Sequence, residues 1–122
     1  MIAEQKLSKS VFSEVNKAFT KQSTIYDKYE EHNTILAWMR NQVHKAALSY
    51  LKMDDNILEL NSGTGTDAVF FAKKGFKVLA TDLSDGMIEK IELKVNHEKL
   101  SDLIDILQCS YTELDRIKNR KF

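Results

Sequence analysis

Two acidic residues on either side of a glycine turn are the residues of this chain best placed to do chemistry. Glu59 lies at the carboxyl end of an apolar strand expected over 57–60, and the turn after it holds Gly63 and Gly65. Glycines let a ligand approach the backbone closely, because no Cβ is in the way. Asp82 follows Gly65 by 17 residues, close to the ~20 expected for an acid that accepts hydrogen bonds from ribose hydroxyls. This pattern predicts a nucleotide-type cofactor site at the ends of parallel strands.

The elements that must position these residues alternate between strand and helix. Hydrophobic periodicity predicts the order strand, helix, strand, helix, strand, with the ranges 57–60, 66–74, 77–82, 85–99 and 103–107. Ser84 can cap the helix 85–99, and a closing helical turn is expected over 112–120. Strands that alternate with helices indicate an α/β fold with a parallel sheet.

The residues before the first strand are expected to be helical. Apolar positions recur every three or four residues within 11–22, and Asn33 can cap a helix over 34–52. That helix carries one apolar stripe, expected to face the core, with Trp38 and Arg40 beside it; its members are Ile35, Leu36, Met39, Val43, Ala46, Ala47 and Tyr50. We therefore expect a helical segment over 1–53 and a sheet-containing domain over 54–122.

The stretch 57–90 closely resembles the start of class I S-adenosylmethionine-dependent methyltransferases. The family's motifs fall in order and at the expected distances on Glu59, Gly63, Gly65, Ala72, Gly75, Asp82, Ser84 and Met87. The resemblance extends more weakly back to Val11 and forward to Leu114. It implies an α/β, Rossmann-like parallel sheet, of which this chain would supply strands one to three, preceded by N-terminal helices.

The same resemblance implies a cofactor, S-adenosyl-L-methionine, and a set of binding residues: Glu59, Asn61, Gly63, Gly65, Asp82, Leu83 and Ser110. Asn61 stands where the family usually has its first glycine, and asparagine is one of the few residues that tolerate left-handed backbone. Ser110 takes the place of an aspartate that normally faces the adenine. Tyr26 and Asp27 would lie near the cofactor as part of an N-terminal lid; alternatively, Tyr26 and Tyr29 pack a helix onto the domain.

The resemblance names no catalytic residue. Methyl transfer depends mainly on holding nucleophile, carbon and sulfur in line, so it needs little acid–base machinery. The methyl acceptor stays open. His32, His44 and His97 have no partner at metal-ligand spacing, so no metal site is expected.

Two alternatives to an active methyltransferase remain. A complete family member has about seven strands, whereas this chain has room for three, so it would be a truncated domain or a non-catalytic, associating fragment. The edge of strand one would then be bare, which favours a homodimer. The other alternative is an NAD-dependent oxidoreductase, because Gly63, Gly65 and Ala68 fit a loose dinucleotide fingerprint. Glu59 argues against it, because such enzymes usually have an apolar residue there.

Composition narrows the class of partner and the compartment. The 122 residues contain 18 lysines and arginines and 18 aspartates and glutamates, so the net charge is zero, which argues against binding nucleic acid by bulk electrostatics. One cysteine allows no internal disulfide. No apolar stretch of membrane-spanning length occurs. We therefore expect a cytoplasmic protein with a small-molecule cofactor and no membrane partner.

Overall fold

The sheet consists of three parallel strands in the order β1-β2-β3. In the computed structural model, which describes residues 2–122 and side chains from residue 10 onward, the strands are β1 (Asn56–Glu59), β2 (Lys77–Asp82) and β3 (Ile104–Gln108). Glu59 pairs with Ala80, and Asp82 pairs with Gln108. The α/β fold with a parallel sheet is confirmed, and β2 begins and ends where the sequence predicted.

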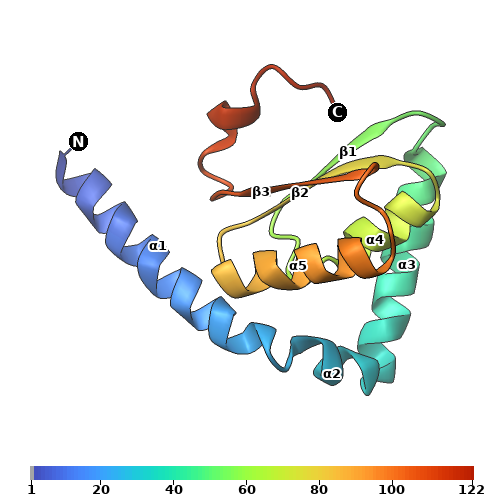
Figure 1. Ribbon diagram of the computed structural model, residues 1–122, viewed down its shortest axis with the longest axis horizontal. Helices are drawn as coiled ribbons and strands as arrows, with labels where there is room; N and C mark the ends of the chain where they lie inside the picture. The colour runs from blue at the N-terminus through green and yellow to red at the C-terminus, as the bar shows by residue number, and fades with distance from the viewer. Residues whose placement is uncertain (1) are drawn as a thin grey trace.

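Two helices connect the strands and cover one face of the sheet. They are α4 (Thr66–Lys73) and α5 (Asp85–His97), and Figure 1 shows both in one layer beneath the strands. Four consecutive residues of β2 are buried, as expected for a central parallel strand. The buried face of α5 is apolar and consists of Met87, Ile88, Ile91 and Val95. In α4 the buried residues are Ala68, Phe71 and Ala72.

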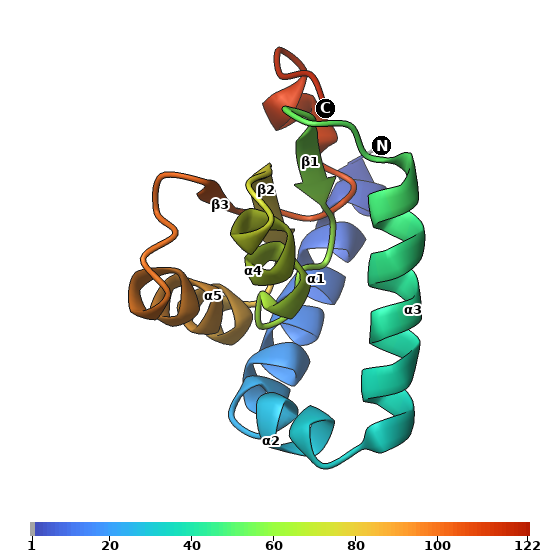
Figure 2. The same cartoon turned by 90° about the vertical axis from the view of Figure 1, so that its right-hand side faces the viewer.

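Three helices precede the sheet. They are α1 (Ile2–Ser23), α2 (Tyr26–Glu31) and α3 (Thr34–Tyr50). Asn33 caps α3 as predicted, since its side-chain oxygen accepts a hydrogen bond of 3.1 Å from the Leu36 amide. Figure 2 shows α3 standing alongside β1, with α2 at its far end. Across residues 2–122, no helix has both the length and the apolar character needed to cross a bilayer.

The face that α3 turns toward the core shares only Leu36 and Ala47 with the predicted one. The residues that pack inward are Leu36, Arg40, His44, Ala47 and Leu48. Most of the predicted core stripe, with Trp38 beside it, is 51–86% exposed; these residues are Ile35, Trp38, Met39, Val43 and Tyr50. Arg40 and His44 both contact Asp67 of α4, and these polar contacts orient the helix.

Helix α1 supplies hydrogen-bond acceptors to the N-terminus of α5. Thr20 Oγ1 accepts a hydrogen bond from the Gly86 amide (3.0 Å), and Asn16 Oδ1 accepts one from the Asp85 amide (2.9 Å). Ser84 caps the same helix as predicted, at 3.3 Å from the Met87 amide. Free amides at the start of a helix need such acceptors. Helix α1 is therefore held against the end of the sheet where β2 stops.

The crossing of α1 over α5 requires glycine at position 86. A Cβ there would overlap Ser23 Oγ and lie 2.9 Å from Thr20 Cα, which is backbone and cannot rotate away. We expect Gly86→Ala to lower the free energy of unfolding by about 1–3 kcal/mol, the usual effect of overpacking. Thermal denaturation would measure this loss. Glu89→Ala, at an exposed position of the same helix, is the control, and equal stability of both variants would contradict the expectation.

The chain ends in a short closing segment that follows β3. Its only regular element is the 3-10 helix η1 (Leu114–Ile117), which lies within the predicted helical turn over 112–120. Cys109, just after β3, is buried, and its amide donates a hydrogen bond of 3.0 Å to the Asp82 carbonyl. Burial raises the pKa of the Cys109 thiol. The segment is thus tied to the carboxyl end of β2.

Candidate functional site

The turn after β1 is built from left-handed backbone. Asn61, Gly63 and Gly65 have φ angles of 53°, 59° and 88°. This confirms that asparagine supports the left-handed conformation expected at position 61. The Ser62 amide donates to the Thr81 carbonyl (2.8 Å), and Ser62 Oγ accepts from the Thr81 amide (3.1 Å). The turn is therefore fastened to β2 before α4 begins.

Asp82 joins this turn to the start of α5. One carboxylate oxygen accepts the Gly63 amide at 2.9 Å, and the other accepts the Ser84 amide at 2.9 Å. A carboxylate offers about four lone-pair sites, so each oxygen keeps one site for a further donor. Asp82 thus shapes the turn and retains two acceptors.

A cavity of about 300 Å³ opens beside Asp82. Its walls come from α1, α2, the glycine turn, the end of β2, α5 and the segment after β3. The lining residues are Val15, Phe19, Tyr26, Asn61, Gly63, Asp82, Leu83, Met87 and Tyr111. Mostly apolar walls with a few convergent polar groups are typical of small-molecule sites, and the volume lies at the lower end of their range.

Four of the seven sequence-predicted binding residues line this cavity: Asn61, Gly63, Asp82 and Leu83. The other three lie outside its wall. Gly65 faces α5 instead, where a Cβ would lie 3.2 Å from Ile91 Cγ1. Ser110 is buried in its own turn, because its hydroxyl accepts a hydrogen bond of 3.1 Å from the Thr112 amide and its amide donates to Glu113.

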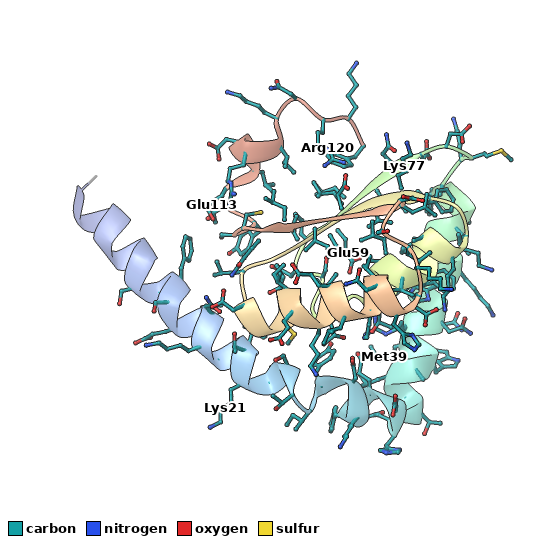
Figure 3. The ribbon with its side chains drawn as sticks, in the orientation of Figure 1. Lys21, Met39, Glu59, Lys77, Glu113 and Arg120 are labelled. Carbon is teal, nitrogen blue, oxygen red and sulfur yellow. The ribbon has the colours of Figure 1, made fainter. Side chains whose placement is uncertain are left out.

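Glu59 is the third predicted residue outside the cavity wall. It ends β1, next to the strand that carries Asp82, and Figure 3 shows it between the strands and the helical layer in that view. Its Oε2 atom is buried and has no hydrogen-bond partner among the residues that the structure describes. Burial, and then repulsion from Asp67, raises the pKa of Glu59 to about 8, although Arg40 opposes the shift. Glu59 is therefore a largely protonated carboxyl at neutral pH.

Sequence reasoning missed part of the cavity wall. Val15 and Phe19 come from α1, and Tyr111 from the segment after β3. Tyr111 had a usable signal, since an aromatic residue just beyond the third strand must lie near the carboxyl edge of a parallel sheet. Of the two N-terminal tyrosines, Tyr26 lines the cavity, whereas Tyr29 is 66% exposed and does not serve as core packing.

The half of the chain that contains the sheet matches a known protein family. Residues 57–122 match the family described as "Methyltransferase domain". The match begins in β1 and includes the glycine turn, Asp82 and the segment after β3. It favours the methyltransferase interpretation of the glycine turn over the nicotinamide alternative.

One individual relative agrees with this family, and two solved structures share the fold. A proposed methyltransferase of Geobacillus sp. (strain WCH70) is 33% identical over 91 residues, which cover 74% of this chain and 36% of that protein. A proposed rRNA methylase of Clostridium thermocellum has 22% identity and a TM-score of 0.57, over 62% of this chain and 44% of the other. The PH0226 protein of Pyrococcus horikoshii OT3 has 19% identity and a TM-score of 0.55, over 68% and 42%. This chain thus spans less than half the length of each.

Proposed function

The chain belongs to the methyltransferase domain family, and from this premise we propose that it binds S-adenosyl-L-methionine in the cavity beside Asp82 for methyl transfer. The observation that carries the proposal is the position of Asp82. Its carboxylate is fixed by two backbone amides at one side of a mostly apolar cavity. We propose further that residues 1–53 act as a helical cover for a cofactor-binding part over 54–122.

The residues of the cavity fit the chemistry of this cofactor. Asp82 keeps one free acceptor site on each oxygen, which suits the two hydroxyls of a ribose. Leu83, Met87 and Tyr111 offer apolar and aromatic surface for a flat base. Gly63 has no atom within 4 Å of where a Cβ would stand, so its open backbone borders the cavity. The carboxylate also suits a ligand that carries net positive charge.

The cofactor, when bound, supplies a methyl group on a positively charged sulfur. The described residues would bind and orient it and keep water out, and this positioning can provide most of the rate enhancement. The methyl acceptor would have to reach the same cavity. We assign no catalytic residue and leave the acceptor open.

Isothermal titration of the purified chain tests the proposal directly. S-adenosylmethionine and S-adenosylhomocysteine should each bind at one site, with dissociation constants in the micromolar range that is ordinary for cofactors of this size, about −8 kcal/mol. NADH is the comparison ligand, because it tests the nicotinamide alternative. Binding of NADH alone would overturn the proposal.

Asn61→Gly should tighten cofactor binding by roughly 3- to 10-fold. The asparagine side chain lies at the cavity wall, and glycine removes it while keeping the left-handed backbone. The free energy of unfolding should change by less than about 1 kcal/mol, because relief of strain offsets the greater entropy of unfolded glycine. Titration with S-adenosylhomocysteine measures the affinity.

A matched control exists for this substitution. Asp54 also has a positive φ, 71°, but lies in the turn before β1 and does not line the cavity. Asp54→Gly should therefore leave the affinity unchanged. Weaker binding by Asn61→Gly would mean that the Asn61 amide itself contacts the cofactor.

We also propose that the chain associates with a second copy along β1. One edge of β1 has no neighbouring strand in this structure. Figure 2 shows the backbone of α3 on the side of β1 away from β2 in that view, and this helix carries exposed apolar residues. A two-fold pairing of β1 edges would therefore bring two such helices close together. Light scattering should give a dimer at micromolar concentration, and a folded monomer would contradict this proposal.

A further inference from the structure

Helix α2 forms part of the cavity wall without being part of the core. Tyr26, its first residue, lines the cavity beside Asp82. None of the six residues of α2 is buried. An element that buries no apolar side chain gains little from packing and opens at a lower free energy than the body of the fold. What holds α2 in place must therefore be polar.

The first polar attachment joins α2 to the glycine turn. Asp27 Oδ1 accepts a hydrogen bond of 2.6 Å from the hydroxyl of Thr64, which is a buried residue of that turn. The same oxygen accepts one of 3.0 Å from Lys94 Nζ of α5. Lys94 also donates to Thr64 and Thr66, at 3.0 and 3.3 Å. One carboxylate thus connects α2, the turn, the start of α4 and α5.

The second attachment joins α2 to α3 and α4. Arg40 of α3 donates to Glu30 of α2 through one guanidinium nitrogen and to Asp67 of α4 through the other. His44 Nε2 lies 2.6 Å from the same Asp67 oxygen, and its ring stacks on Phe70 at 3.8 Å. Helix α4 begins directly after the glycine turn. This second attachment therefore also joins α2 to the carboxyl edge of the sheet, where the cavity lies.

We propose that Asp27 is a positioning residue that couples closure of α2 over the cavity to the conformation of the glycine turn. This inference rests on the proposed function, because the cavity is taken to hold the cofactor. When Asp27 binds Thr64 and Lys94, Tyr26 closes the wall. When those bonds break, the wall opens and the turn loses a contact, while Arg40 still tethers Glu30. Cofactor release should therefore depend on a carboxylate that does not line the cavity.

Asp27→Asn, with Glu31→Gln as the control, tests the coupling. Glu31 is an exposed carboxylate at the end of α2, and among the described residues no hydrogen bond or ion pair joins it to the turn. Hydrogen exchange of residues 25–33 is measured first, without any ligand. Asp27→Asn should raise exchange in this segment roughly 10-fold, since a charge-assisted hydrogen bond is replaced by a weaker neutral one. Amides of β2 and α5 should exchange at the wild-type rate.

The second measurement is the dissociation rate of S-adenosylhomocysteine by stopped flow. It should rise roughly 5- to 10-fold in Asp27→Asn and stay unchanged in Glu31→Gln. Thr64→Val, which removes the donor and keeps the side-chain shape, should reproduce the effect of Asp27→Asn. Raising the salt concentration should speed dissociation from the wild-type chain more than from Asp27→Asn, because salt screens an ion pair only where one is present.

The two measurements separate this inference from the proposed function. Wild-type dissociation and exchange rates in both Asp27→Asn and Thr64→Val would overturn the coupling. Exchange that rises throughout the protein would also overturn it, because that result means general destabilisation. If the wild-type chain bound no S-adenosylhomocysteine, the proposed function would fail, and the exchange of residues 25–33 would still decide whether Asp27 holds α2.

Discussion

Replacing Asp82 with alanine is expected to weaken S-adenosylhomocysteine binding at least 100-fold. The substitution removes both acceptors proposed for the ribose and leaves the Gly63 and Ser84 amides without their partner. Each hydrogen bond to a charged group contributes about 1.5–3 kcal/mol, so the loss of two corresponds to roughly 10²- to 10⁴-fold in affinity. Isothermal titration measures the loss.

Two further variants separate the lost contacts from damage to the turn. Asp82→Asn keeps one acceptor oxygen and a similar shape, so it should fall between the wild type and the alanine variant. Asp85→Ala removes an exposed carboxylate three residues along the chain that does not line the cavity, and it should bind normally. Wild-type affinity in Asp82→Ala would exclude Asp82 as the ribose acceptor.

Glu59 should make the fold less stable as the pH rises. Its pKa is about 8 in the folded chain and 4.5 without perturbation. Between these values the unfolded chain has lost the proton while the folded chain keeps it, so the unfolded state binds fewer protons and stability falls with rising pH. Below about pH 4.5 both states are protonated and the stabilisation is fully present; above about pH 8 it is lost. The total change in the free energy of unfolding is about 5 kcal/mol.

Glu59→Gln should abolish this pH dependence, because glutamine resembles the protonated carboxyl and does not titrate. At pH 9 the variant should be more stable than the wild type by roughly the same 5 kcal/mol. Urea denaturation at pH 5, 7 and 9 gives the comparison. Glu92→Gln, at an exposed position on α5, is the control. If the free energy of unfolding of the wild type were constant from pH 5 to pH 9, Glu59 would be ionised in the folded chain throughout this range, and the prediction would be wrong.

Local sequence patterns were sufficient to predict several parts of the fold. The continuous apolar run of β2, the caps at Asn33 and Ser84, and the left-handed Asn61 all follow from residues close together in the chain. The meeting of Asp82 with the glycine turn also followed, because parallel strands place their carboxyl ends at the same edge.

Hydrophobic periodicity did not predict the buried face of a helix where polar residues far away in the chain decide the orientation of that helix. In α3, the apolar stripe at Ile35, Met39 and Val43 predicted the buried face, but Arg40 and His44 turn inward because both contact Asp67. Asp67 lies 27 and 23 residues further along the chain, beyond the range of any helical pattern. The same limit applies to Val15 and Phe19, which lie in the cavity wall because α1 packs against α5.

The buried thiol of Cys109 gives the protein an internal chemical reporter. It is the only cysteine, so a sulfhydryl reagent can modify the chain at one position. The adjoining peptide group is bound to the end of β2 beside Asp82, so the thiol becomes reachable only when that corner of the sheet separates. The rate of alkylation therefore follows the opening of this corner without any label being introduced.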